Sequence, residues 1–123
     1  MSHIVTIQTQ VRDAAAVAAA CQRIGLPAPR EGTTQLFSGE ATGLIVELPG
    51  WRYPVVCELS TGTLNFDDFG GQWGERRVLD QFLQRYACER AKLEARRKGH
   101  TVTERTLVDG SIRLTIELAG GVA

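Results

Sequence analysis

Few side chains in this sequence have the types and spacing that catalysis or metal binding requires. His3 and His100 are its only histidines, and neither has a neighbour at the spacing of a metal ligand. Asp67-Asp68 is the best carboxylate pair, because two carboxylates in a flexible loop can bind a divalent cation. Adjacent side chains diverge and no further ligands follow, so we interpret this pair as a solvated turn and predict no metal site.

The cysteines are the other candidates for chemistry. Cys21, Cys57 and Cys88 lie far apart without a CxxC spacing, and each falls near the apolar face of its predicted element. A thiolate nucleophile needs a base or a helix N-terminus, so we expect buried free thiols instead. Phosphate-binding, dinucleotide-binding and serine-hydrolase motifs are missing from the sequence. We therefore predict no enzyme and no cofactor. An enzyme that uses Cys57 or the Asp67-Asp68 loop remains a third hypothesis.

Length and composition predict one soluble domain. The 123 residues suit a single domain, 1–123, and the 14 basic and 14 acidic residues cancel. No apolar run approaches the roughly 18 residues needed to cross a membrane. An odd number of cysteines, with an N-terminal segment unlike a signal peptide, favours a reducing, cytoplasmic location.

Loop aromatics beside an arginine are the first candidates for partner binding. Trp51, Arg52 and Tyr53 follow a Pro-Gly turn, and Trp73 lies in a second, glycine-rich loop. Packing on the core is the default role of such rings. Tryptophan and arginine are the residues that most often dominate protein interfaces, so we predict a partner-binding surface here with Trp51 as its anchor.

A cation-rich helix, predicted from about Glu75 to Lys98, is the second candidate. It contains eight basic and four acidic residues, a net charge of +4, which would attract an anionic partner. Three interpretations stay open: a solvated salt-bridged face, a protein contact that includes Arg90 and Arg97, and nucleic-acid binding, for which interleaved aromatics are missing. Opposite-charge pairs at i,i+4 are predicted at Arg76/Asp80, Arg85/Glu89, Arg90/Glu94 and Glu94/Lys98.

Hydrophobic periodicity predicts the elements that position these residues. Strands are expected at 3–11, 34–37, 44–48, 53–59 and 63–66, with a loop at 28–32. A first helix is capped by Asp13 and ends at Gly25, and the cation-rich helix ends at Gly99. The predicted core stripe of this second helix is Leu79, Phe82, Leu83, Tyr86 and Leu93.

The chain is predicted to end in a hairpin of residues 101–108 and 111–118, with a type I′ turn on Asp109-Gly110. Its core-facing residues would be Ile112, Leu114, Ile116 and Leu118. The predicted fold is α+β: an antiparallel, twisted sheet of about six strands with two helices packed on one face, in the order β-α-β-β-β-β-α-β-β.

Three segments resemble a known family. They are Met1-Ser2-His3-Ile4 with Ile7, Thr9, Arg12 and Asp13, then Gln84-Arg85-Tyr86-Ala87, then Asp109-Gly110-Ser111-Ile112-Arg113-Leu114, joined by Lys98-Gly99. With them the chain resembles the hypothetical chloroplast reading frame thirty-five family, a domain of unknown function in plastids, cyanobacteria and other bacteria. The match spans nearly the whole chain, and residues 28–73 depart from the pattern. The resemblance implies a small soluble companion of other small proteins or AAA-type ATPases, without defined catalytic residues.

These observations together predict a non-enzymatic protein-binding or adaptor module whose partner is another protein. The alternative is a nucleic-acid-binding protein that uses the basic helix from Glu75 to Lys98. The candidate partner-binding residues are Trp51, Arg52, Tyr53, Trp73, Arg90 and Arg97.

Overall fold

The protein has the predicted α+β architecture. A computed structural model describes residues 4–118, and the order of helices and strands in it is the predicted one. The elements are β1 (Val5–Gln8), α1 (Ala14–Arg23), β2 (Arg30–Gln35), β3 (Glu40–Val46), β4 (Val55–Glu58), β5 (Thr63–Phe66), the short 3-10 helix η1 (Phe69–Gly71), α2 (Arg76–Arg97), β6 (Thr101–Thr106) and β7 (Ile112–Glu117).

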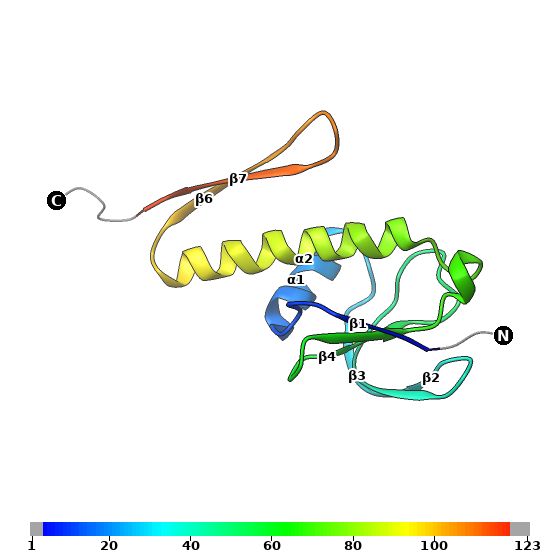
Figure 1. Cartoon of the computed structure of the whole chain (residues 1–123). Coiled ribbons are helices and arrows are strands. Elements are labelled where there is room, and N and C mark those ends of the chain that lie inside the picture. The colour runs from blue at the N-terminus through cyan, green and yellow to red at the C-terminus, as the bar shows by residue number, and fades with distance from the viewer. Residues whose placement is uncertain (1–3, 119–123) are drawn as a thin grey trace.

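A five-stranded antiparallel sheet forms the base of the molecule. Its strand order is β1-β5-β4-β3-β2, so three consecutive hairpins are completed by β1, which pairs with β5. Close spacing along the chain dictates this arrangement, because parallel strands would need long crossover connections. Both helices lie on one face of this sheet, as predicted (Figure 1).

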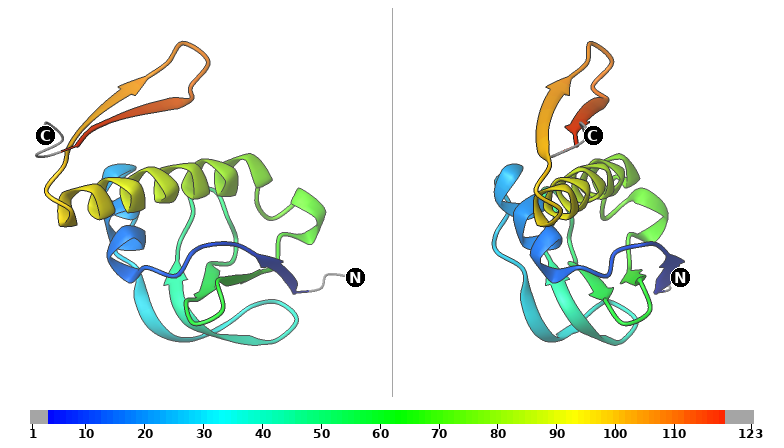
Figure 2. Two further views of the ribbon diagram at one scale, coloured as in Figure 1. Left: turned by 60° about the vertical axis from the view of Figure 1, so that its left-hand side comes forward. Right: turned by 90° about the vertical axis from the view of Figure 1, so that its left-hand side faces the viewer.

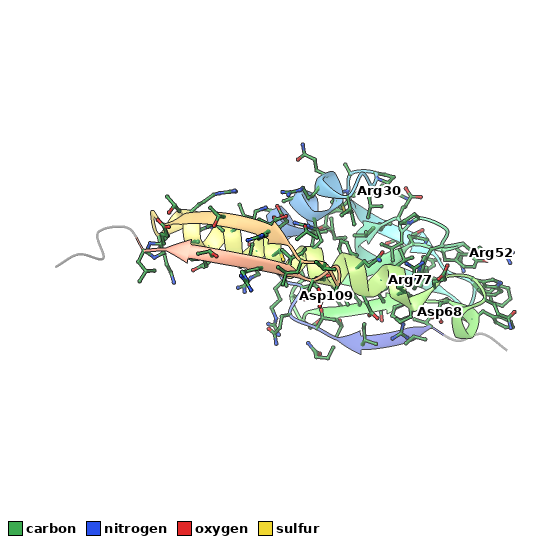
Figure 3. The ribbon with its side chains drawn as sticks, turned by 90° about the horizontal axis from the view of Figure 1, so that it is seen from above. Arg30, Arg52, Asp68, Arg77 and Asp109 are labelled. Atoms are coloured by element: carbon green, nitrogen blue, oxygen red, sulfur yellow. The ribbon has the colours of Figure 1, made fainter. Side chains whose placement is uncertain are left out.

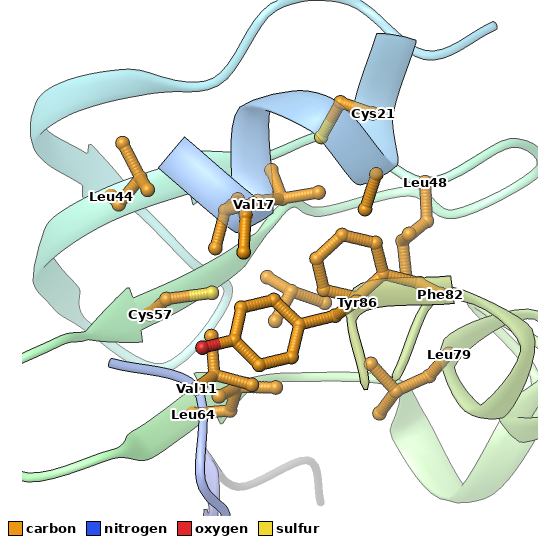
Figure 4. Close-up of a cluster of buried hydrophobic side chains, with 14 of the residues drawn as sticks. Val11, Val17, Cys21, Leu44, Leu48, Cys57, Leu64, Leu79, Phe82 and Tyr86 are labelled. Carbon is orange, nitrogen blue, oxygen red and sulfur yellow. The ribbon is translucent and has the colours of Figure 1, made fainter. Parts of the chain in front are cut away.

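The core lies between the sheet and the two helices. Phe82 and Tyr86 of α2 point toward Val17 and Cys21 of α1 and toward the strands (Figure 4). The predicted stripe of α2 is confirmed, since Leu79, Phe82 and Tyr86 are buried and Leu83 and Leu93 pack against them. A smaller cluster on the opposite face of the sheet contains Leu36, Ala41, Ile45 and Val56.

The predicted helix ends are confirmed in detail. Asp13 accepts hydrogen bonds from the amides of Ala15 and Ala16, at 3.0 and 3.3 Å, and so caps α1. Gly25 adopts a left-handed φ of 75°, and the amide of Leu26 donates to the carbonyl of Cys21 at 2.8 Å. This is a Schellman motif, which glycine favours because it lacks a Cβ.

The prediction that the C-terminal hairpin joins the sheet is wrong. Among the described residues, β6 and β7 pair only with each other, so the main sheet has five strands rather than about six. The hairpin lies on the far side of α2 from the sheet (Figure 1, Figure 2). The reversal at Gly99 returns the chain along the outer surface of α2 and keeps it away from the sheet edges.

The hairpin therefore has no core of its own. None of the residues in β6 and β7 is buried, and Ile116 and Leu118 are 42% and 67% exposed. Its turn also differs from the predicted type I′, which needs positive φ at both central residues. Within the described chain only Gly110 of the Asp109-Gly110 pair has positive φ, and its amide donates to the Leu107 carbonyl.

Several strand boundaries also differ from the predicted ones: β1 ends at Gln8 rather than at residue 11, and β3 is Glu40–Val46 rather than 44–48. Residues 30–32, expected in a loop, belong to β2, whose register with β3 pairs Arg30 with Ile45 and Gln35 with Glu40. Polar side chains on this edge strand conceal the alternation on which strand prediction depends.

Gly74 generates a test of how the loop before α2 packs. A Cβ at this buried position would overlap the Trp51 ring, whose indole N–H donates to the Glu75 carbonyl at 3.1 Å. We expect Gly74→Ala to lower the free energy of unfolding in urea by about 2 kcal/mol, through overpacking. Gly39→Ala is the matched control, because a Cβ at Gly39 would meet Ile4 at 3.7 Å, an ordinary van der Waals contact. Equal effects of the two substitutions would contradict the assigned packing.

Candidate functional site

A partly buried cluster of charges attaches the hairpin to both helices. Glu104 of β6 receives Lys92 Nζ at 2.9 Å and Arg85 Nη1 at 3.0 Å on one carboxylate oxygen, and Arg23 Nη2 at 2.8 Å on the other. Glu89 completes the cluster, at 2.8 Å from Lys92 and 3.3 Å from Arg85. The Glu104 side chain is 14% exposed. Hydrogen bonds from Lys92 and Arg85 lower the pKa of Glu104 from 4.5 to about 2.

This ion cluster restricts the interpretation of α2 as a solvated, salt-bridged face to part of the helix, since residues such as Arg90, Glu94 and Arg97 are exposed. Glu89 and Lys92 are buried beneath the hairpin, and Arg85 is partly buried with them. Of the predicted i,i+4 pairs, Arg85/Glu89 and Glu94/Lys98 form, whereas the described ion pairs do not include Arg76/Asp80 or Arg90/Glu94. The sequence contains a signal for the burial of these charges. Glu104 lies two residues after Val102, so both side chains point to the inward face of the hairpin.

An apolar groove runs along the C-terminal half of α2, beside the ion cluster. Its volume is about 590 Å³, and it separates α2 and the hairpin from the segment that precedes α1. Alanines recur at about one-turn spacing on this side of α2. Because their side chains are short, the space beside the helix stays open. The lining comes from Leu83, Ala87, Ala91 and Ala95 of α2, from Ile116 and Leu118 of the hairpin, and from Thr9, Gln10 and Val11.

Tyr86 fixes the wall of the groove opposite the hairpin. Its hydroxyl accepts hydrogen bonds from the amides of Arg12 and Asp13, both at 3.1 Å, and donates to the carbonyl of Gln10 at 3.3 Å. A buried tyrosine normally satisfies its hydroxyl in this way. The segment before α1 is thereby held against α2, and the groove has a defined edge.

Two of the sequence-predicted binding residues lie at or near this groove. Arg90 lines it, is exposed, and forms no ion pair within the described residues. Arg97 lies outside the lining and contacts Asp13 at 3.7 Å and Glu94 at 3.6 Å. Lys98 also lines the groove and reaches Glu94 at 3.8 Å. Arg90 is therefore a cation in the lining of the groove that forms no ion pair among the described residues, with Glu94 in the same lining one turn away.

Three other predicted residues gather at the opposite end of α2. Trp73 stacks on Phe69 with ring centroids 4.7 Å apart and contacts Tyr53 and Phe37 at 5.5 and 5.0 Å. The Arg52 guanidinium lies 4.9 Å from the Trp73 ring centroid, in a cation–π contact. We call these five residues the aromatic cap. The outward position of Arg52 is visible in Figure 3.

Trp51 does not join the aromatic cap. Its ring packs at 5.6 Å on Phe66, against the main core, and its indole N–H is used by the Glu75 carbonyl. The predicted anchor is thus a half-buried part of the packing between sheet and loop. Of the six predicted residues, Trp51 lies at the core edge, three belong to the aromatic cap, Arg90 lines the groove and Arg97 lies outside the lining.

The groups considered for catalysis are buried. Cys21, Cys57 and Cys88 are free and buried as expected, and burial raises the pKa of Cys57 to about 12. The interpretation of Asp67-Asp68 as a solvated turn is wrong, because both are buried and Asp67 accepts a hydrogen bond from Ser38 at 3.1 Å. Within residues 4–118 no three His, Cys, Asp or Glu side chains lie close enough to hold a metal ion.

Comparison with known proteins supplies no functional information on this chain. No protein-family model, curated protein or solved structure matches the chain. The family resemblance in the sequence therefore stays a prediction. None of the helices in the described part of the chain is long and apolar enough to cross a membrane.

The ion cluster predicts a specific pH dependence. Because the pKa of Glu104 is about 2 in the folded protein and 4.5 ordinarily, its stabilisation is complete above pH 4.5 and is lost as the pH falls toward 2. We expect Glu104→Gln to reduce the free energy of unfolding by about 3 kcal/mol at neutral pH. The difference from the wild type should shrink between pH 4.5 and 2.

Urea titrations at several pH values measure this difference. Glu31→Gln is the control, because Glu31 is exposed and forms no ion pair among the described residues. A Glu104→Gln effect that is the same at every pH would show that the carboxylate charge is not what holds the hairpin.

Burial of the cysteines predicts their reactivity. We expect iodoacetamide at mildly alkaline pH to leave all three thiols of the native protein unmodified, since burial raises the pKa of each. Mass spectrometry should show three modifications after denaturation. Rapid labelling of Cys57 in the native protein would contradict its buried position and revive the hypothesis of a catalytic thiol.

Proposed function

We propose that this protein is a non-enzymatic protein-binding module whose groove, bounded by α2, the C-terminal hairpin and the segment before α1, receives an apolar segment of another protein. The observation that carries this proposal is the open apolar groove of about 590 Å³, which the chain's own side chains leave unfilled. Burial of apolar surface is the main driving force for such association.

The charge beside the groove supports a segment that also carries a carboxylate. Arg90 lines the groove without an ion pair in the described structure, and its planar guanidinium suits bidentate contact with a carboxylate. Exposed Ile116 and Leu118 would be covered by the same segment. The expected ligand is therefore a short peptide with several apolar side chains and an aspartate or glutamate.

The aromatic cap supports an adaptor role. Its loops precede the N-terminal end of α2 (Figure 1), whereas the groove lies along the C-terminal half of that helix, so two partners would bind at opposite ends of α2. Phe37, which is 55% exposed, would supply apolar contact area there, while Arg52 would supply charge. The family resemblance makes a small companion protein or an AAA-type ATPase the first partner to test. Free thiols accord with a cytoplasmic location.

Nucleic-acid binding is the weaker proposal. Two of the cations that gave α2 its positive charge, Arg85 and Lys92, are engaged by Glu89 and Glu104 beneath the hairpin. The aromatic cap is not interleaved with the exposed cations of α2. Binding to duplex DNA would weaken steeply with salt, by a slope of about −0.9 for each phosphate contact, which distinguishes it from apolar peptide binding.

A displayed library of random peptides tests the proposed groove. We expect the selected peptides to combine apolar residues with a carboxylate, and their NMR shift changes to fall on Ala87, Arg90 and Ala91. Ala87→Trp should lower peptide affinity at least about tenfold, because the indole would occupy the groove. Ala87 is exposed, so the substitution leaves the core intact.

Ala18→Trp is the matched control, since Ala18 is an exposed alanine on α1, away from the groove. Arg90→Glu should shift the selected peptides from acidic to basic residues. If selection enriches no peptide, or if the shift changes fall on the aromatic cap, the groove is not the binding site.

A further inference from the structure

The geometry points to self-association of this protein through antiparallel pairing of β7 with β7 of a second copy, centred on Thr115. The inference goes beyond the proposed function, because it uses the hydrogen-bonding edge of β7, although Ile116 and Leu118 belong to both the groove and the proposed dimer contact. It rests on the free edge of β7, on its charge pattern and on its exposed apolar residues.

The edge of β7 is available for pairing. Within the described residues β7 pairs only with β6, so its other edge has no strand beside it. Seen from above, β6 lies on the α1 side of the hairpin and β7 on the β1 side, with its edge uncovered (Figure 3). Natural edge strands are often blocked by proline, by charged side chains or by a bulge. Ile112–Glu117 contains no proline, and its only two charges, Arg113 and Glu117, are opposite in sign.

The hydrogen-bonding pattern assigns which backbone groups face that edge. The amide of Leu107 donates to the carbonyl of Ser111 at 2.8 Å, so Ser111 is directed toward β6. Alternation along an antiparallel ladder then directs Arg113, Thr115 and Glu117 toward β6 as well. The backbone groups of Ile112, Leu114, Ile116 and Leu118 are left for a new strand.

Two-fold symmetry restricts the registers that a second copy can adopt. The axis of an antiparallel pair is normal to the sheet, so each side chain stays on its own face and only residues an even number apart can meet. A register centred on Thr115 places Arg113 opposite Glu117 of the second copy, and the symmetry repeats this pair. A register centred on Leu114 or on Ile116 does not place Arg113 opposite Glu117.

Within one copy of the hairpin, Arg113 and Glu117 have no oppositely charged residue across from them. In the hairpin Arg113 lies directly opposite Arg105, and Glu117 lies opposite Thr101. Two like charges at directly opposed positions destabilise a hairpin. Neither Arg113 nor Glu117 has an ion pair among the described residues, and both are exposed. The register centred on Thr115 supplies each with an opposite charge.

The same register covers apolar surface. On the inner face it places Ile116, which is 42% exposed, opposite Leu114 of the second copy. Leu118, which is 67% exposed, comes opposite Ile112. The result would be a continuous four-stranded sheet with β6 at both edges, and sheets of three or more strands with an apolar face are more stable than a lone hairpin.

The other free edges lack this complementarity. Glu104 and Arg105 of β6 are adjacent, so they point to opposite faces and cannot meet across a two-fold axis. Arg30 and Glu31 of β2 are adjacent in the same way, and β1 (Val5–Gln8) contains no charged residue. Among the strands that the structure describes, only β7 is self-complementary in charge.

Charge reversal tests the pairing by analytical ultracentrifugation over a series of protein concentrations. The wild type is expected to form dimers, and Arg113→Glu or Glu117→Arg to weaken them about tenfold, because two symmetric pairs become repulsive. The double variant R113E/E117R should restore the wild-type affinity. An equimolar mixture of the two single variants should form heterodimers, which native mass spectrometry identifies by mass.

Unfolding does not explain the expected loss, because Arg113→Glu places a glutamate opposite Arg105 and so favours the hairpin. Glu31→Arg, an exposed reversal on β2, is the control. A wild type that stays monomeric, single variants that associate normally, or a mixture that does not associate would overturn the inference. Ala87→Trp, which fills the groove, should leave the dimer unchanged, so failure of the groove proposal is separately visible.

Discussion

The carboxylate of Glu104 is the contact on which the outer layer of this protein depends. A two-stranded hairpin is marginal by itself in water, and none of the residues in β6 or β7 is buried. Three cations from two helices converge on this one side chain: Arg23 from α1, and Arg85 and Lys92 from α2. Desolvation offsets much of the attraction in such a cluster, so its main effect is on orientation. It determines where the hairpin lies.

Both proposed surfaces follow from that position. With β6 held over the charged face of α2, β7 lies toward β1 and leaves its edge free (Figure 3). Below it, the alanines of α2 are too small to close the space, and an apolar groove results. An ion pair suits this arrangement because it fixes the hairpin through one inward side chain, whereas a continuous apolar contact would have filled the groove.

The local features of the chain could be predicted because they depend on neighbouring residues. Asp13 at the start of α1, Gly25 at its end and the apolar stripe of α2 each follow from hydrogen bonding or periodicity within a few residues. The candidate site was less accessible. Arg90 was identified and lines the groove, but Trp51 packs on Phe66 instead of facing a partner. Periodicity reports that a face is apolar and does not report which neighbour covers it.

The sequence by itself determined the order of the elements, the helix ends and the pairing within each hairpin, since these depend on contacts that are short along the chain. Only the tertiary structure decided that the last hairpin packs on the outside of α2, that Glu89 and Lys92 are buried, and that Asp67 lies inside a loop that looked solvated. The physical reason is that burial of a charge is decided by partners distant in sequence. Glu104 reaches Arg23 across 81 residues, and no local pattern contains that contact.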